Sequence, residues 1–430
     1  MQTIVAILTL SFLIIIHEFG HFIVAKLSDI KVLEFSLFMG PKLFSVQKGE
    51  TQYSVRLIPL GGYVKMEGEE AASEDERAYN KKPLRVRASV LAAGPLMNII
   101  SAIIIIVLLS SLTGYSTTRI EVIDTTSQTY EAGIREGDEI VSFDNKRVFH
   151  PADIYLFLFG TKGKPAEIEV IRNGEKKTFT VYPEVIPKNR FIIGFTPKKS
   201  FGEESNIIGN IDPESPGYKA GLRQGDKIVK LNDTPVDNNR EIREFMNRNS
   251  GQTVKVTVDR DGQELQFETV PITDLNEEQY DIGIYFARAK GNFIETIRYS
   301  FRYAYSVARN VMYSIIWLIT GRVSLSQLSG PIGIVGVIGD VVEQSPTFFD
   351  KFIGVFSLAS FISINLGLVN LVPFPALDGS KLLLLAVEGI RKKPIPPEKE
   401  AFISFIGFIF LIILMIFSTY NDILRRVTGG

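Results

Sequence analysis

The segment His17-Glu18-Phe19-Gly20-His21 holds the residues whose types and spacing are best suited to chemistry. On a helix, a spacing of four places both imidazoles on one face, with Glu18 beside them. Such a pair can supply two nitrogen ligands to zinc, and the glutamate is placed to take a proton from a metal-bound water. The alternative is a histidine pair in a polar corner of a helical bundle. Because the motif lies in an apolar run, where ionisable side chains are costly, we favour the functional site.

A catalytic zinc needs a third protein ligand. The chain has no cysteine, and its only other histidine, His150, lies in a polar region far along the sequence. We therefore expect a carboxylate to complete the site. Asp378 is the membrane-proximal candidate, because it follows an apolar run in which Pro373 and Pro375 should break a helix. Irregular backbone at membrane depth requires surrounding protein or a water-filled cavity, which suits a site that a substrate strand must enter.

Four long apolar runs predict the transmembrane helices that position these residues. They lie within 1–27, 88–114, 352–378 and 400–421, and each supplies the roughly 20 residues that a crossing requires. A fifth apolar stretch, 304–320, contains Arg309 and follows interleaved arginines and aromatics. We assign it to interfacial amphipathic helices within 291–345. With four spans, helices one and three run in the same direction, so the histidines and Asp378 reach the same leaflet.

Between the second and third spans, the chain is soluble in character and contains an internal repeat. Residues 132–141 return as 220–229 with seven of ten positions identical, and Ile193-Gly194-Phe195 returns as Ile282-Gly283-Ile284. We therefore predict two α+β domains, 115–200 and 201–290. Each resembles a PDZ domain of the bacterial, circularly permuted kind. In that family the turn around Gly194 or Gly283 would bind a peptide's C-terminal carboxylate. The alternative is that these glycines merely serve tight turns.

Charge distribution narrows the possible partners and predicts the orientation. The 47 basic and 48 acidic residues cancel, which argues against a nucleic-acid surface. Eleven Lys or Arg residues lie between positions 26 and 87, and Arg391-Lys392-Lys393 lies between the third and fourth spans. The positive-inside rule therefore places both loops in the cytoplasm and the repeats outside.

The order of HExxH in the first span, paired PDZ-like repeats and a late Leu377-Asp378-Gly379 resembles the site-2 protease family, specifically the bacterial RseP type. Further family-like segments include Gly94 to Asn98, Gly61 to Met66 and Asn365 to Asn370. The resemblance covers nearly the whole chain. It departs from the family after the aspartate, where Ser380-Lys381 replaces the commoner Gly-His.

The resemblance implies roles for particular residues. His17, His21 and Asp378 would bind Zn²⁺, and Glu18 would be the general base. Residues 53–66, within the cytoplasmic loop 28–87, would form a membrane-reentrant β-hairpin that presents substrate as an added strand. The substrate-binding residues would be Gly62, Tyr63, Val64, Asn365 and Asn370.

These features together predict a polytopic α-helical membrane protein that hydrolyses peptide bonds in or near transmembrane segments. The resemblance implies membrane-anchored substrates such as single-span regulators, including anti-sigma factors, and remnant signal peptides. It also implies a bacterial cytoplasmic membrane, with the PDZ-like domains controlling access from outside. Two alternatives stay open: a catalytically inactive PDZ scaffold, which would need no Glu18, and a zinc transporter, which would have little use for peptide-binding domains.

Overall fold

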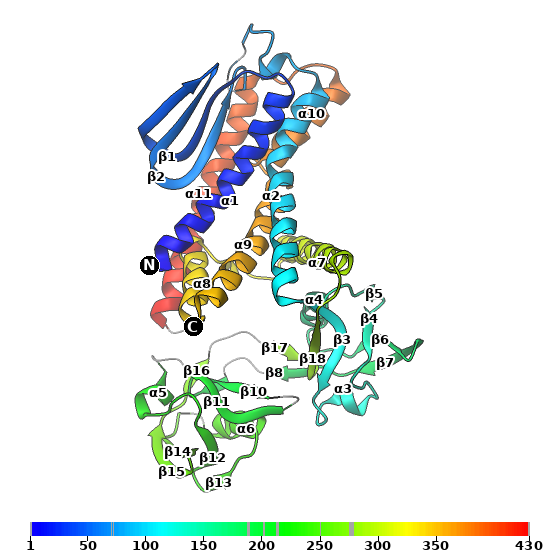
Figure 1. Cartoon of the computed structure of the whole chain (residues 1–430), viewed down its shortest axis with the longest axis vertical. Helices are drawn as coiled ribbons and strands as arrows, with labels where there is room; N and C mark the ends of the chain where they lie inside the picture. Colours follow the sequence, from blue (N-terminus) through cyan, green and yellow to red (C-terminus); the bar gives the residue numbers. More distant parts are fainter. Residues whose placement is uncertain are drawn as a thin grey trace. The chain divides into compact units, whose positions relative to one another are not determined.

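The computed structural model describes residues 2–69, 71, 73–186, 190–200, 203–211, 215–249, 251–274 and 279–428. Its internal contacts divide the chain into two compact units. The helical unit contains Met1–Tyr115 and Lys290–Leu424, and the sheet unit is built on Ser116–Ala289. The sheet unit is thus inserted in the sequence of the helical unit (Figure 1).

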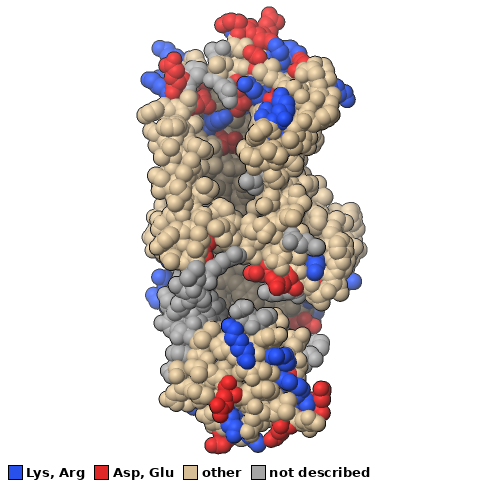
Figure 2. Space-filling view, turned by 90° about the vertical axis from the view of Figure 1, so that its left-hand side faces the viewer, with Lys and Arg blue, Asp and Glu red and all other residues tan. Residues whose placement is uncertain are grey.

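The helical unit has seven α-helices among its described residues. They are α1 (Gln2–Leu27), α2 (Leu84–Thr113), α7 (Phe293–Ile319), α8 (Pro331–Gln344), α9 (Phe348–Leu371), α10 (Asp378–Arg391) and α11 (Pro397–Thr428). In this described part, α1, α2, α9 and residues Glu398–Leu424 of α11 are long and apolar enough to cross a membrane. These match the four predicted spans. Figure 2 shows charged side chains gathered at the upper end of this unit, above a broad uncharged band.

The predicted third span, 352–378, ends earlier than expected. Helix α9 stops at Leu371, and Asp378 is the first residue of the separate helix α10. The connection contains Pro373 and Pro375, whose missing N–H groups end the helical hydrogen bonding. Ala376 in this connection has a φ of 78°, in the left-handed region. The carboxylate therefore lies at a helix N-terminus, where the helix dipole favours a negative charge.

Helix α2 is the centre of the helical unit and packs against α1, α7, α9 and α10. Glycines allow two of these contacts to be close. A methyl group on Gly20 of α1 would collide with the carbonyl oxygen of Ala93, and one on Gly367 of α9 would lie 2.7 Å from the carbonyl oxygen of Pro95. Small residues at helix crossings are the usual means of close packing within membranes.

A sheet is formed by β1 (Val32–Lys48) and β2 (Thr51–Met66), each of which folds back on itself. The pairing register gives four segments in the order 62–66, 32–37, 51–55 and 42–48, in which 51–55 runs parallel to 32–37 and the two outer pairings are antiparallel. The predicted hairpin 53–66 needs correction, because its two halves pair with 32–37 rather than with each other. Segment 62–66 forms one edge of this sheet.

The sheet unit contains two sheets of the same strand order, as expected from the repeat. One has the order β18-β3-β4-β6-β7 and the other β10-β11-β12-β14-β15. The strands of the first sheet are β18 (Ile284–Ala289), β3 (Tyr115–Ile123), β4 (Glu139–Phe143), β6 (Ala166–Arg172) and β7 (Glu175–Val181). Those of the second are β10 (Phe195–Ser200), β11 (Glu203–Ile211), β12 (Lys227–Leu231), β14 (Val254–Arg260) and β15 (Gln263–Thr269). Helix α4 (Pro151–Thr161) precedes β6, and α6 (Asn239–Arg248) precedes β14.

The two domains are nested rather than consecutive. Strand β10 pairs with β11, and β18, at the far end of the unit, pairs with β3. The predicted boundary between residues 200 and 201 is therefore wrong, because it divides the β10–β11 pair. We call residues 190–274 the inserted domain, and 115–186 with 279–289 the outer domain.

Two short ladders join the inserted and outer domains. Strand β8 (Glu184–Ile186) pairs with β17 (Gln279–Asp281), and β9 (Arg190–Ile192) pairs with β16 (Ile272–Asp274). The chain therefore leaves the outer domain and returns to it along adjacent antiparallel strands.

Candidate metal centre

The structure brings His17, His21 and Asp378 together from two helices. The distances are 3.1 Å between the two histidine Nε2 atoms, 3.0 Å from His17 Nε2 to Asp378 Oδ2, and 3.5 Å from His21 Nε2 to Asp378 Oδ2. One ligand atom from each residue lies within 4.8 Å of the others. Two imidazole nitrogens and a carboxylate oxygen form a donor set that suits zinc and leaves a fourth position open.

Gly94 of α2 leaves room beside this group. A methyl group there would collide with Nε2 of His21 and would lie 2.8 Å from Nε2 of His17. Any side chain at this position would therefore occupy the space in front of both ligand atoms. This geometry fits a metal ion held by the three residues.

Hydrogen bonds on the far side of each ring orient the histidines. Nδ1 of His21 lies 2.8 Å from the carbonyl oxygen of Val90, so Nδ1 donates and Nε2 is left to bind a metal. Nδ1 of His17 lies 3.3 Å from Nδ2 of Asn98, whose Oδ1 is buried without a hydrogen-bond partner in the described part of the chain. Amide oxygen and nitrogen are assigned by hydrogen bonding. Turning the amide lets Oδ1 accept a hydrogen bond from His17 Nδ1–H.

Glu18 lies next to the edge of the β1–β2 sheet. A methyl group on Gly62 would lie 3.8 Å from Cγ of Glu18. Segment 62–66 pairs with 32–37 on one side, and Gly62 is opposite Leu37. A proton-accepting side chain and a strand edge thus lie side by side.

Aromatic packing holds the sheet against α1. The ring of Phe35 lies 5.0 Å from that of Phe22, centroid to centroid, and Phe19 also contacts Phe35 edge-on. Further along the helix, the hydroxyl of Ser11 donates to the carbonyl oxygen of Pro59. Residues 56–61, which connect segments 51–55 and 62–66 within β2, therefore reach the middle of a helix that is long enough to cross a membrane.

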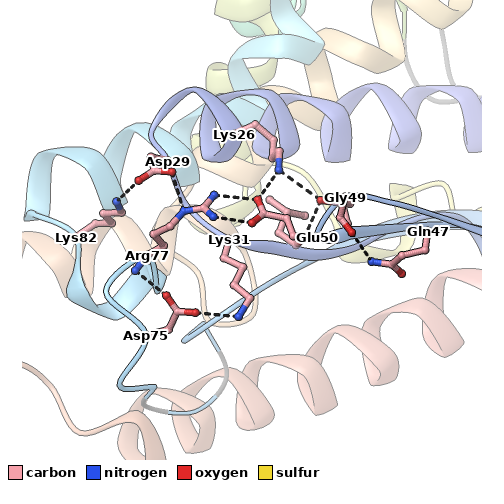
Figure 3. Close-up of polar contacts among 11 residues, drawn as sticks. Lys26, Asp29, Lys31, Gln47, Gly49, Glu50, Asp75, Arg77 and Lys82 are labelled. Atoms are coloured by element: carbon pink, nitrogen blue, oxygen red, sulfur yellow. Dashed lines mark hydrogen bonds and ion pairs between the residues drawn. The ribbon is translucent and has the colours of Figure 1, made fainter.

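An ionic network anchors the other end of the sheet (Figure 3). Glu50, in the turn between β1 and β2, pairs with Arg77 at 2.6 Å and with Lys26 of α1 at 2.7 Å. Arg77 also pairs with Asp29 at 2.7 Å. The hydrogen bonds from Arg77 and then Lys26 lower the pKa of Glu50 to about 2. The turn is thereby tied to the end of α1 that lies just beyond the histidines.

The remaining predicted substrate-binding residues lie on two elements, β2 and α9. Tyr63 accepts a hydrogen bond from Arg56 at 2.6 Å, and Val64 packs against the core at the end of α1. The Asn365 amide donates to the carbonyl oxygen of Phe361 within α9, at 2.8 Å. Asn370 lies in the last turn of α9. Neither asparagine belongs to the group of three ligand atoms.

Lys381, where the sequence departs from its family pattern, forms an ion pair near the site. Its Nζ lies 3.1 Å from Oε1 of Glu69. Lys381 is on the first turn of α10 with Asp378, and Glu69 follows the edge segment 62–66. The ion pair therefore joins α10, which carries Asp378, to the chain that follows the edge segment 62–66.

Comparison with known proteins identifies the family. The model of peptidase family M50 matches residues 5–414. The chain belongs to this family, the site-2 proteases. It is 31% identical over 442 residues to the zinc metalloprotease RasP of Oceanobacillus iheyensis, covering 99% of both chains. It is also 31% identical to the regulator of sigma-W protease RasP of Bacillus subtilis, covering 96% of both. A putative zinc metalloprotease of Clostridium acetobutylicum is 30% identical, covering 99% of this chain and 98% of that protein.

Membership of family M50 confirms the predicted zinc-dependent intramembrane peptidase, with Zn²⁺ as its cofactor. The inactive scaffold and the zinc transporter are therefore set aside. The crystal structure of the HtrA3 PDZ domain bound to a phage-derived ligand is similar to 22% of this chain and 89% of that chain, with 23% identity and a TM-score of 0.16. Sequence reasoning named Gly94 to Asn98 as a family-like segment but assigned neither Gly94 nor Asn98 to the site. Their other signal is a glycine and an amide within the uncharged run 88–114.

Proposed function

We propose that His17, His21 and Asp378 hold the zinc ion and that Glu18 is the general base of intramembrane peptide-bond hydrolysis. The convergence of three ligand atoms within 4.8 Å carries the proposal. When bound, zinc polarises the scissile carbonyl and lowers the pKa of a water molecule. A carboxylate oxygen of Glu18 accepts the proton of the attacking water and delivers it to the leaving nitrogen.

Segment 62–66 presents the substrate as an added strand. A helical substrate shields its carbonyl groups within its own hydrogen bonds, so it must become extended before attack. Pairing with a sheet edge satisfies the exposed backbone groups of the extended form. Gly62 lies beside Glu18, which places the first residue of this edge next to the general base.

The substrates are membrane-anchored proteins, such as single-span regulators and remnant signal peptides. One relative is named a regulator of sigma-W protease, which supports regulators of this kind. The positive flanks of the spans support an active site toward the cytoplasm, in the bacterial cytoplasmic membrane, with the PDZ-like domains outside. There they control which substrates reach the site.

Reconstituted enzyme and a single-span model substrate test the catalytic assignment. Glu18→Gln should keep one zinc per chain and cleave at under about a hundredth of the wild-type rate, because the amide cannot accept a proton. Zinc is measured in the same sample by atomic absorption. A zinc-loaded Glu18→Gln protein that cleaves at a tenth of the wild-type rate or faster would remove the general-base role.

A further inference from the structure

One carboxylate of the outer domain is bound to its own backbone. Oδ1 of Asp281 accepts hydrogen bonds from the N–H of Ile282 at 2.7 Å and of Gly283 at 2.9 Å. These are the first two N–H groups of the turn Ile282-Gly283-Ile284. In a PDZ-like domain such a turn is where a peptide's C-terminal carboxylate binds. The protein's own carboxylate thus occupies a carboxylate-binding position.

The inserted domain contains the same turn without the acid. Ile193-Gly194-Phe195 is preceded by Ile192 at the position that corresponds to Asp281. Both glycines have positive φ values, 86° for Gly194 and 66° for Gly283. The two turns therefore share their backbone form and differ in the residue before it.

The surroundings of the glycines also correspond. A methyl group on Gly194 would collide with Ser215, which caps α5 (Pro216–Ala220). One on Gly283 would lie 2.7 Å from Cβ of Ser127, which caps α3 (Gln128–Glu131). Each turn rests on a capping serine, so the exchange of isoleucine for aspartate is a local difference between two similar sites.

Side chains of the outer domain also meet between α4 and β18, where an added peptide strand would lie. The rings of Tyr155 on α4 and Phe286 on β18 are in edge-to-face contact, with centroids 6.5 Å apart. Strand β17, which ends at Asp281, contacts α4. Burial and then the negative charge of Asp281 raise the pKa of Tyr155 on that helix.

We propose that Asp281 is a built-in competitor that excludes peptide C-termini from the outer domain, so the turn Ile193–Phe195 of the inserted domain is the one that binds them. The proposal rests on the PDZ-like role of these domains in the proposed function. A second carboxylate at the outer turn would have to displace Asp281 and overcome its like charge. At the inserted turn, Phe195 on β10 and Phe245 on α6 are partly buried hydrophobic residues, which favours a tail that ends in an apolar residue.

Peptide titration of the full-length protein tests the assignment. The probe is a fluorescein-labelled decapeptide ending in valine with a free carboxylate, its amidated form is the control, and all variants carry Glu18→Gln to prevent cleavage. The parent protein should bind one peptide, and the amidated form at least about tenfold more weakly. Asp281→Ile, which copies the inserted domain, should raise the stoichiometry to two. Ile192→Asp, the reciprocal change, should abolish binding in the parent protein.

A second measurement needs no peptide. With glycine-selective ¹⁵N labelling, the amide resonance of Gly283 should shift as the Asp281 carboxyl titrates, and Asp281→Ala should remove that shift. The corresponding titration should be absent at Gly194 in the parent protein and appear in Ile192→Asp. This reports the contact directly, even if a variant alters peptide affinity by loosening a domain.

Three results would overturn the proposal: two peptides bound by the parent protein, no peptide bound at the inserted turn, or a Gly283 resonance indifferent to Asp281. Neither readout involves zinc or cleavage. Failure here would therefore leave the catalytic assignment intact, and failure of the Glu18→Gln test would leave this proposal intact.

Discussion

Gly94 on α2 faces His21 on α1 so closely that a single methyl group at position 94 would collide with Nε2 of the imidazole. The space for a metal ion is therefore created by the lack of a side chain on a neighbouring helix. Both histidines come from α1 and the carboxylate comes from α10. Helix α2 supplies no proposed ligand, but its backbone at Gly94 borders the space in front of both Nε2 atoms.

Gly94→Ala should weaken zinc binding, because the methyl group must push the imidazoles away from the shared position. We expect the zinc affinity to fall at least roughly tenfold, about 1.4 kcal/mol, measured by chelator competition on purified protein. Gly389→Ala in α10 is a matched control, since a methyl there meets the nearest atom, on Leu84, at 3.5 Å. Wild-type zinc affinity in Gly94→Ala would show that the ion lies elsewhere.

Asn98 should fix the ring orientation of His17 by accepting its Nδ1 proton. Removing the acceptor with Asn98→Leu should lower zinc affinity by roughly 10- to 100-fold, as for other partners of metal-bound histidines. Asn98→Asp retains an acceptor and should keep the ion. If Asn98→Leu and wild type lose zinc to a chelator at the same rate, Asn98 Oδ1 does not accept the hydrogen bond from His17 Nδ1–H.

Much of this site could be predicted from the sequence, because its chemistry depends on residue types at fixed spacing. The HExxH motif fixes two imidazoles and an acid on one helical turn, and Pro373 and Pro375 reveal the irregular backbone before Asp378. Asn98 and Gly94 act through contacts between helices, which no spacing within one helix encodes.

The nesting of the two domains escaped prediction for a different reason. A repeat reports similarity of segments and does not report which strands pair. The turns around Gly194 and Gly283 both lie near the end of a sequence repeat. Yet β10 pairs with β11, which follows it in the chain, whereas β18 pairs with β3, which lies far before it. Pairing between strands that are distant in sequence depends on the packed domain.

The Lys381–Glu69 pair should couple α10 to the segment that follows 62–66, the proposed substrate-presenting edge. Lys381→Met and Glu69→Gln should each lower kcat/KM about two- to tenfold, and the double variant should be no worse than either. A double-mutant cycle should give a coupling of about 1 kcal/mol. The exposed pair Lys81–Glu74, at 2.9 Å, is the control and should show no coupling in activity. Strictly additive effects at Lys381 and Glu69 would contradict the link.

His150 should make the start of α4 sensitive to acid. Its Nδ1 accepts a hydrogen bond from the N–H of Ala152, and burial lowers its pKa to about 4 against an ordinary 6.5, although Asp153 opposes the shift. Between about pH 4 and 6.5, His150 is therefore protonated in the unfolded chain and neutral in the folded one. Stability should fall as the pH drops from about 6.5 to 4, by at most about 3 kcal/mol.

Hydrogen exchange of residues 150–162, compared between proteins at each pH, measures this loss. His150→Asn keeps an N-cap acceptor without a titrating group and should show no loss beyond the intrinsic pH dependence of exchange. Equal acid sensitivity in both proteins would assign the effect to another group.

Cysteine labelling should establish the membrane topology, since the natural chain contains no cysteine. Asn80→Cys and Lys393→Cys should react with an impermeant maleimide only from the cytoplasmic side, because both positions lie in strongly basic loops. Glu136→Cys and Asp233→Cys, at exposed positions of the outer and inserted domains, should react only from the opposite side. In the proposed topology the four crossings alternate in direction, and α1 and α9 both run toward the cytoplasm, which brings His17 and Asp378 to the same depth. Labelling of positions 136 and 393 from the same side would contradict this alternation. It would also remove the topological argument that His17 and Asp378 belong to one site.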